Sequence, residues 1–159
     1  FRLTGTSQSK QILKFIKEEK LMPTNYVLVD FENLQPKNLG FLKSKDYKVF
    51  VFVDAKQSKL DFDTVLAVQD LGINAQYIKI NGAGSNALDF HMAYFLGELI
   101  FKDGNGCFFV VSKDRGFDPL VQHISSKKIT ISRMNVITDI SDRGVSTHKK
   151  QSLKINEPS

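Results

Sequence analysis

Between Tyr26 and Met134 the sequence alternates short runs of β-branched and other apolar residues with longer amphipathic stretches. This alternation is typical of a parallel sheet whose crossover helices cover both of its faces. Because each apolar run is continuous, both faces of every strand are expected to be buried. We therefore predict an α/β protein, a three-layer α/β/α sandwich around a central parallel sheet of roughly five strands.

The periodicity also gives approximate bounds for each element. Strands are expected at Tyr26–Asp30, Lys48–Val53, Ala75–Ile80, Cys107–Ser112 and Lys128–Arg133. Helices are expected near Pro36–Lys43, Phe62–Leu71, Ala87–Phe101 and Pro119–Ser125, with Asp61, Asn86 and Asp118 as start signals and Pro119 in the first helical position. A further helix near Ser9–Lys20 either packs on the sheet or belongs to an upstream linker.

Length and composition fit a single compact domain, since the chain has 159 residues, of which 42% are hydrophobic. We predict an N-terminal helical extension or linker over residues 1–23, the α/β domain over 24–142, and a basic, flexible tail over 143–159. The apolar runs are far shorter than the roughly 20 residues that span a bilayer, so no membrane association is expected. A single cysteine excludes an internal disulfide and favours a reducing, cytoplasmic setting. The chain begins with Phe1, which suggests a fragment of a longer protein.

The positive charge is concentrated at the two ends of the chain. The formal net charge is +5, and residues 143–159 carry four Lys or Arg against one Glu. Basic ends of this kind can hold nucleic acid near a site, although they can equally be solvated tails that aid solubility.

Acidic residues follow several of the predicted strands. Asp30, Glu32 and Asn33 follow the first strand, Asp54 the second, and Asp114 and Asp118 the fourth. Because ligands of open α/β sheets bind beyond the carboxyl ends of the strands, these side chains are expected to share one edge. Each has a structural alternative as well: Asp118 as a helix N-cap, Asp89 as support for a first helical turn, and Asp30 as an Asx-turn.

Asp89 is the most informative of these acids. On the helix predicted at Ala87–Phe101, it lies on the same side as Ala93, Leu96 and Ile100, so it heads the stripe that faces the sheet. An inward carboxylate is costly without a cation or hydrogen-bond donors, and several together repel one another. Mg²⁺ or Mn²⁺, which prefer oxygen ligands, would relieve that repulsion and could activate water against a phosphodiester.

The acids lie in four blocks of the sequence, namely LVDFENLQPKNL at 28–39, VFVDAKQSKLDFD at 51–63, GSNALDFHMAYFLGEL at 84–99 and SKDRGFDPLVQHI at 112–124. Together these blocks resemble the PIN-like nuclease superfamily, in particular its small bacterial PIN-like and NYN-type domains. The resemblance implies a metal-dependent nuclease that hydrolyses phosphodiester bonds, most often an endoribonuclease acting on single-stranded RNA.

Carried over to this sequence, the resemblance implies catalytic roles for Asp30, Asn33, Asp89, Asp114 and Asp118. It implies that Mg²⁺ or Mn²⁺ is held by Asp30, Asp89, Asp114 and Asp118, with Asn33 orienting a water or a ligand carboxylate. Glu32 and Asp54 do not match the family's set, and Asp54 is kept as a candidate at the rim.

Lysine and arginine residues near these acids are candidate phosphate contacts, namely Lys56, Lys59, Lys113 and Arg115. The expected partner is RNA, with single-stranded DNA, a homo-oligomer or an inhibitor protein as further alternatives. Two other functions stay open: a non-catalytic PIN-like module that binds RNA or protein within a longer chain, and a phosphatase or phosphotransferase with Asp30 as nucleophile.

The basic C-terminal segment yields a test of its own. Deleting residues 143–159 removes four cationic residues and one anionic residue, and should weaken nucleic-acid binding and lower the dependence of log K on log salt. Fluorescence anisotropy with a labelled single-stranded RNA at several salt concentrations measures both quantities. An unchanged slope would show that the segment makes no phosphate contacts.

Overall fold

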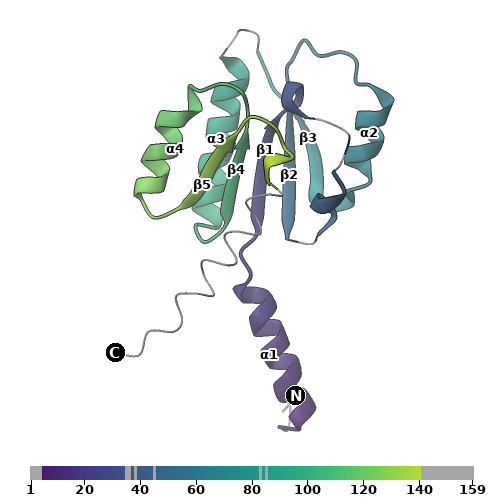
Figure 1. Ribbon diagram of the computed structural model, residues 1–159, viewed down its shortest axis with the longest axis vertical. Coiled ribbons are helices and arrows are strands. Elements are labelled where there is room, and N and C mark those ends of the chain that lie inside the picture. Colours follow the sequence, from purple (N-terminus) through teal and green to yellow (C-terminus); the bar gives the residue numbers. More distant parts are fainter. Residues whose placement is uncertain are drawn as a thin grey trace.

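The computed structural model describes residues 5–34, 37, 39–44, 46–82, 84 and 86–140, to which the structural statements below refer. A five-stranded parallel sheet forms its centre, in the order β3-β2-β1-β4-β5 (Figure 1). The strands are β1 (Asn25–Asp30), β2 (Tyr47–Val53), β3 (Ala75–Lys79), β4 (Cys107–Val111) and β5 (Thr130–Met134). All five predicted strands are present, within one or two residues of their expected bounds.

Helices cover both faces of this sheet, which confirms the predicted three-layer α/β/α architecture. They are α2 (Phe62–Gln69), α3 (Ala87–Lys102) and α4 (Phe117–Ser126), with 3₁₀ helices η1 (Phe31–Asn33), η2 (Leu39–Lys43) and η3 (Gly72–Asn74). Of the helix expected near Pro36–Lys43, the structure describes Leu39–Lys43 as a 3₁₀ helix and Lys37 as a turn residue, and residues 36 and 38 lie outside the described residues.

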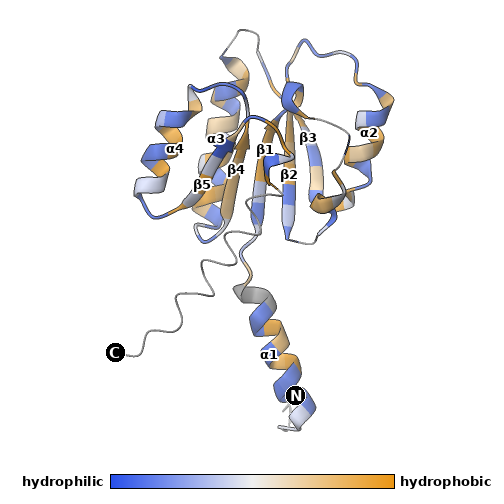
Figure 2. Ribbon diagram, viewed as in Figure 1, coloured by the Kyte–Doolittle hydropathy of each residue, from blue (hydrophilic) through white to orange (hydrophobic). Residues whose placement is uncertain are grey.

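Alternate residues of each strand supply two separate hydrophobic clusters, one on each face. In β1, Val27 and Val29 pack with α2 and η2, whereas Tyr26 and Leu28 pack with α3 and α4. All four are buried, and hydrophobic residues dominate the central strands (Figure 2). Burial on both faces explains why the strands are continuous apolar runs in the sequence.

The strand order places β1 at the centre, with β2 on one side and β4 on the other. The chain therefore winds outward in one direction through β2 and β3, and in the other through β4 and β5. The carboxyl ends of β1 and β4 are adjacent at this change of direction, which is where open α/β sheets bind their ligands.

The first residues of α4 and of β5 differ from the predicted ones. Helix α4 starts at Phe117 with Gly116 as its N-cap, so Asp118 is in the first turn and Pro119 is third in the helix. The expected cap at Asp118 and first position at Pro119 were wrong. Strand β5 starts at Thr130 rather than Lys128, because Lys128 adopts a positive φ of 64° in the turn that leaves α4.

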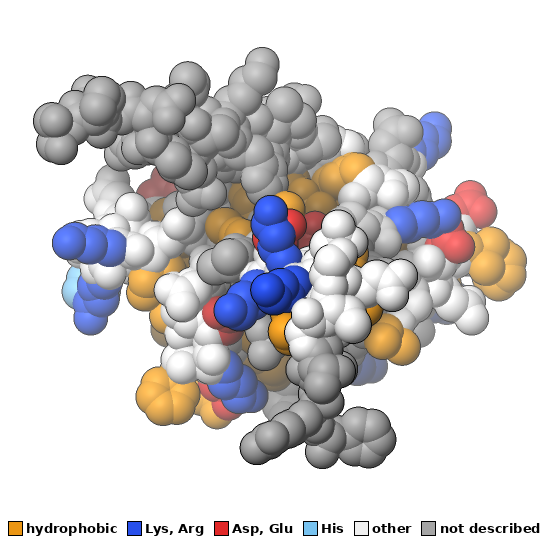
Figure 3. Space-filling model, turned by 90° about the horizontal axis from the view of Figure 1, so that it is seen from below, with side chains coloured by type: hydrophobic (Ala, Val, Ile, Leu, Met, Phe, Trp, Pro, Cys, Tyr) orange, Lys and Arg blue, Asp and Glu red, His pale blue; other side chains and the backbone are white. Residues whose placement is uncertain are grey.

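Helix α1 (Ser7–Leu21) projects beyond the sheet and covers neither of its faces (Figure 1). Its apolar residues Ile12, Leu13, Phe15 and Ile16 are exposed. Seen from below, Lys and Arg side chains gather near the middle of this end of the molecule (Figure 3). Because α1 lies away from both faces of the sheet, the structure does not show the first of the two predicted alternatives, in which this helix packs on the sheet.

Among the described residues, no helix combines the length and the apolar character that crossing a bilayer requires. The predicted basic tail at 143–159 lies outside the described residues, as do the last residues assigned to the α/β domain.

Candidate functional site

A pocket of about 360 Å³ opens at the carboxyl ends of β1 and β4, where the sequence predicted a site. Its lining combines acidic side chains with a few polar, apolar and basic ones. The lining residues are Asp30, Phe31, Glu32, Asn33, Asp54, Gln57, Leu88, Asp89, Ser112, Lys113 and Asp114. Of the five predicted catalytic residues, the structure brings four into this pocket and leaves out Asp118.

Asp30 is the last residue of β1 and the N-cap of η1. Its Oδ1 accepts a hydrogen bond from the Glu32 backbone N–H at 3.1 Å, so the predicted Asx-turn and the position in the pocket occur together. Burial raises the pKa of the Asp30 carboxyl, and repulsion from Glu32 and Asp54 adds to the rise, although the Glu32 N–H opposes it. Asn33, at the end of η1, is buried and also lines the pocket.

Asp89 lies in the first turn of α3 and faces the pocket, as its position on the apolar stripe predicted. Burial, a hydrogen bond with Asp114 and repulsion from Asp114 and Asp30 raise the pKa of the Asp89 carboxyl to about 6. Burial makes the largest contribution to this rise, and the neighbouring carboxylates of Asp114 and Asp30 add to it.

Asp114 lies in the loop between β4 and α4. Its Oδ1 accepts a hydrogen bond of 2.7 Å from the Gly116 backbone N–H, which lowers the pKa of this carboxyl; the neighbouring Asp89 and Arg133 lower it further. A Cβ at position 116 would lie 3.0 Å from Asp114 Oδ1. Glycine therefore lets the carboxylate approach the backbone, and any side chain there would crowd it.

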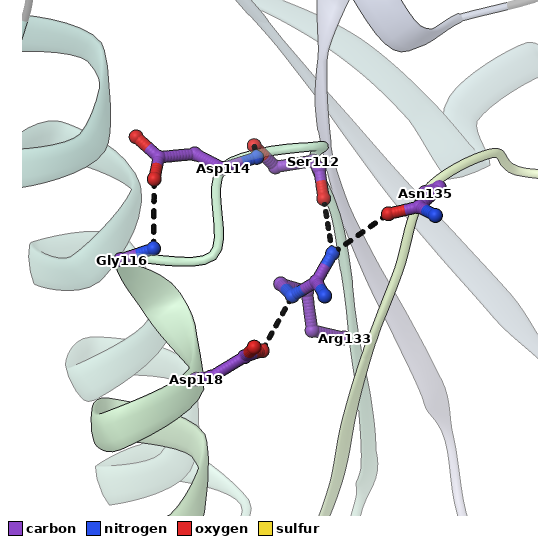
Figure 4. A network of polar contacts seen from close by, with 6 residues as sticks. All are labelled: Ser112, Asp114, Gly116, Asp118, Arg133 and Asn135. Carbon is purple, nitrogen blue, oxygen red and sulfur yellow. Dashed lines mark hydrogen bonds and ion pairs between the residues drawn. The ribbon is translucent and has the colours of Figure 1, made fainter.

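Asp118 is directed to a different partner. Its Oδ1 accepts a hydrogen bond of 2.5 Å from Arg133 Nε, and Figure 4 shows it pointing toward the guanidinium. In the same view the Asp114 carboxylate points away from Arg133. Asp118 pairs with Arg133 and does not line the pocket, so we omit it from the metal ligands proposed below.

The four cationic candidates are not equally placed. Lys113 lines the pocket, and Arg115 is exposed in the same loop, one residue beyond Asp114. Lys56 and Lys59 are exposed on the segment after β2 and do not line the pocket.

Sequence reasoning assigned no role to Gln57, Ser112 or Arg133, and treated Asp54 only as a rim candidate. Asp54 and Gln57 lie on the loop that leaves β2, beside β1, and both contribute to the lining. For Asp54 the signal was its place after a strand; for Arg133, inside a strand, nothing in the sequence indicated that its side chain would reach the β4–α4 loop.

The donor set suits a hard divalent cation, since carboxylate and amide oxygens are the ligands that Mg²⁺ and Mn²⁺ prefer. Within the described part of the chain, no three His, Cys, Asp or Glu side chains are already arranged as a metal site. Asp114 and Asp30 nevertheless both raise the pKa of Asp89, so their negative charges add to the cost of burying that carboxylate. These residues fit a cation that would draw them together.

Comparison with known families identifies the domain that carries this pocket. The family model described as PIN domain matches residues 24–134, which contain the whole sheet and the pocket. The chain therefore belongs to the PIN domain family, a family of generally hydrolytic nucleases. No curated protein sequence and no solved structure matches the chain.

The shifted pKa of Asp89 predicts a pH-dependent stability of the metal-free protein. Between about pH 4 and pH 6 the folded state holds a proton on Asp89 that the unfolded chain releases, so the free energy of unfolding should fall as pH rises. The raised pKa of Asp30 adds to this fall. The lowered pKa of Asp114 has the opposite effect, because it costs stability as pH falls below the ordinary pKa of an aspartate. Asp89→Asn should flatten this fall and leave the protein at least as stable as wild type at pH 7.

Thermal melts in EDTA from pH 4 to pH 7 measure this effect, with Asp63→Asn as the control. Asp63 is an exposed acid in the first turn of α2 and lies outside the pocket lining. An Asp89→Asn protein that melts well below wild type at pH 7 would identify Asp89 as a structural support of α3 instead.

Proposed function

We propose that this protein is a Mg²⁺- or Mn²⁺-dependent nuclease, and specifically an endoribonuclease that cleaves single-stranded RNA. The observation that carries the proposal is the convergence of Asp30, Asp89 and Asp114 in one pocket from three separate elements. Their mutual influence is visible in the raised pKa of Asp89, which both neighbours increase.

Asp30, Asp89 and Asp114 would hold the cation, directly or through water. When bound, the cation would supply Lewis-acid polarisation of a phosphodiester and lower the pKa of a bound water. The protein's own contribution is to hold the three carboxylates at the end of a rigid sheet, which limits the rearrangement needed for binding. Buried Asn33 would orient a water or one of these carboxylates through its amide.

The cationic residues would contact the phosphates on either side of the scissile bond. Lys113 is the best placed, because it lines the pocket next to Asp114. Exposed Arg115 would contact the same RNA strand from the loop. Lys56 and Lys59 lie farther along the surface and would contact phosphates beyond the pocket. Contacts of this kind position the substrate without reading its sequence.

Replacing the ligands tests the proposal. Asp30→Asn and Asp114→Asn should each lower Mn²⁺-dependent cleavage of a single-stranded RNA by about 100-fold or more, because each removes a carboxylate charge that would hold the cation. Both variants should stay folded, since they withdraw charge rather than core volume. Initial rates and circular dichroism provide the two measurements.

Asp63→Asn is the matched control, because it makes the same chemical change at an exposed position outside the pocket. Its rate should equal that of wild type. If wild type binds the RNA but shows no cleavage that EDTA or Asp30→Asn abolishes, the chain is a non-catalytic RNA-binding module. A phosphorylated Asp30 trapped during turnover would instead indicate phosphotransfer.

A further inference from the structure

Arg133 connects three segments that meet beside the pocket (Figure 4). From β5, its Nη1 donates a hydrogen bond of 2.8 Å to the Ser112 carbonyl at the end of β4, and its Nε donates one of 2.5 Å to Asp118 in α4. Nη1 also donates to Asn135 Oδ1 at 2.9 Å. A single guanidinium thus joins the end of β4, the first turn of α4 and the exit of β5.

Arg133 and Ser112 are mostly buried, whereas Asp118 is partly exposed to solvent. The side chain of Arg133 is 13% exposed and that of Asp118 44%, and Ser112 is almost fully buried. The planar fork of arginine suits this arrangement, since its separate N–H groups bind several acceptors in fixed directions.

Both contacts are made at the ends of the loop that carries Asp114. Residue 112 begins this loop and residue 118 lies just after it, in the first turn of α4. Within the loop, Ser112 Oγ accepts a hydrogen bond from the Asp114 N–H at 3.1 Å, and Asp114 accepts one from the Gly116 N–H. Movement at the Ser112 end would therefore reach the backbone N–H of Asp114, and movement at the α4 end would reach its carboxylate through the Gly116 N–H.

We propose that Arg133 and Asp118 form a clamp that positions Asp114 for the cation, with Arg133 as a positioning residue and Asp118 as its partner instead of a metal ligand. The clamp rests on the proposed function, because it deepens the role of the same site. It also accounts for an acid near the pocket that is turned away from it.

Binding of Mn²⁺ alone, followed by electron paramagnetic resonance of the free ion, tests the clamp without any substrate. Arg133→Met and Asp118→Asn should each weaken Mn²⁺ binding by about 10- to 100-fold, the usual effect of losing a group that orients a ligand. Arg133→Lys should also weaken it, because lysine keeps the charge but loses the fork. The double variant should be no weaker than the weaker single variant, since both remove one unit.

The opposite results would overturn the clamp. If Asp118 were a ligand restrained by Arg133, Arg133→Met would free it, remove a repelling cation and strengthen Mn²⁺ binding. If Arg133 served only the stability of the fold, Mn²⁺ affinity would be unchanged in the folded variants. Asp118→Asn provides a milder change of a half-exposed residue, so the test stands even if Arg133→Met does not fold.

Amide hydrogen exchange in the metal-free protein separates failure of the clamp from failure of the proposed function. The amides of Asp114 and Gly116 should exchange at least about tenfold faster in Asp118→Asn than in wild type, whether or not the protein binds metal. Unchanged exchange would contradict the clamp alone. A wild type that binds no Mn²⁺ would contradict the proposed function, while faster exchange in the variant would still support the clamp.

Asp70→Asn is the matched control for Asp118→Asn. Asp70 forms an exposed ion pair with Lys43 at 2.5 Å and does not line the pocket. Breaking that pair should change neither Mn²⁺ affinity nor exchange of the loop amides. A loss equal to that of Asp118→Asn would show that the effect is one of net charge, which would also contradict the clamp.

Discussion

Partly buried carboxylates that repel one another lie at the carboxyl edge of this sheet. Asp30, Asp89 and Asp114 come from a strand end, a helix start and a loop, and burial together with the neighbouring Asp114 and Asp30 raises the pKa of Asp89 to about 6. Acids held this way favour protonation or a cation, and at neutral pH protonation is incomplete. The arrangement is therefore unfavourable for the metal-free fold and favourable for cation binding.

The apolar sheet makes such an arrangement possible. Strand β1 is buried on both faces and lies between β2 and β4, so the position of Asp30 at its end is fixed by the core rather than by the pocket. Asp114 has no strand to hold it and depends on its loop, where the Gly116 N–H and the contacts of Arg133 at both ends replace the sheet. The buried strand β1 and the hydrogen bonds of the Asp114 loop thus hold the carboxylates in place against their mutual repulsion.

Much of this architecture could be predicted from the sequence, because continuous apolar runs indicate buried parallel strands and their ends indicate the site. The placement of Asp30, Asn33, Asp89 and Asp114 in one pocket followed from those ends and from the helical position of Asp89. Asp118 was less predictable, since its direction depends on Arg133, 15 residues later in a neighbouring element. Periodicity gives the face on which a residue lies, but pairings between distant elements depend on side-chain reach.

The most direct test of the central claim is a crystal of the protein soaked in Mn²⁺ and measured for anomalous scattering. The account predicts one or two peaks in the pocket, contacted by Asp30, Asp89 and Asp114 directly or through water, and their loss in Asp114→Asn. The account would be contradicted if the pocket held no cation at millimolar Mn²⁺. It would also be contradicted if the ion displaced Arg133 and bound Asp118.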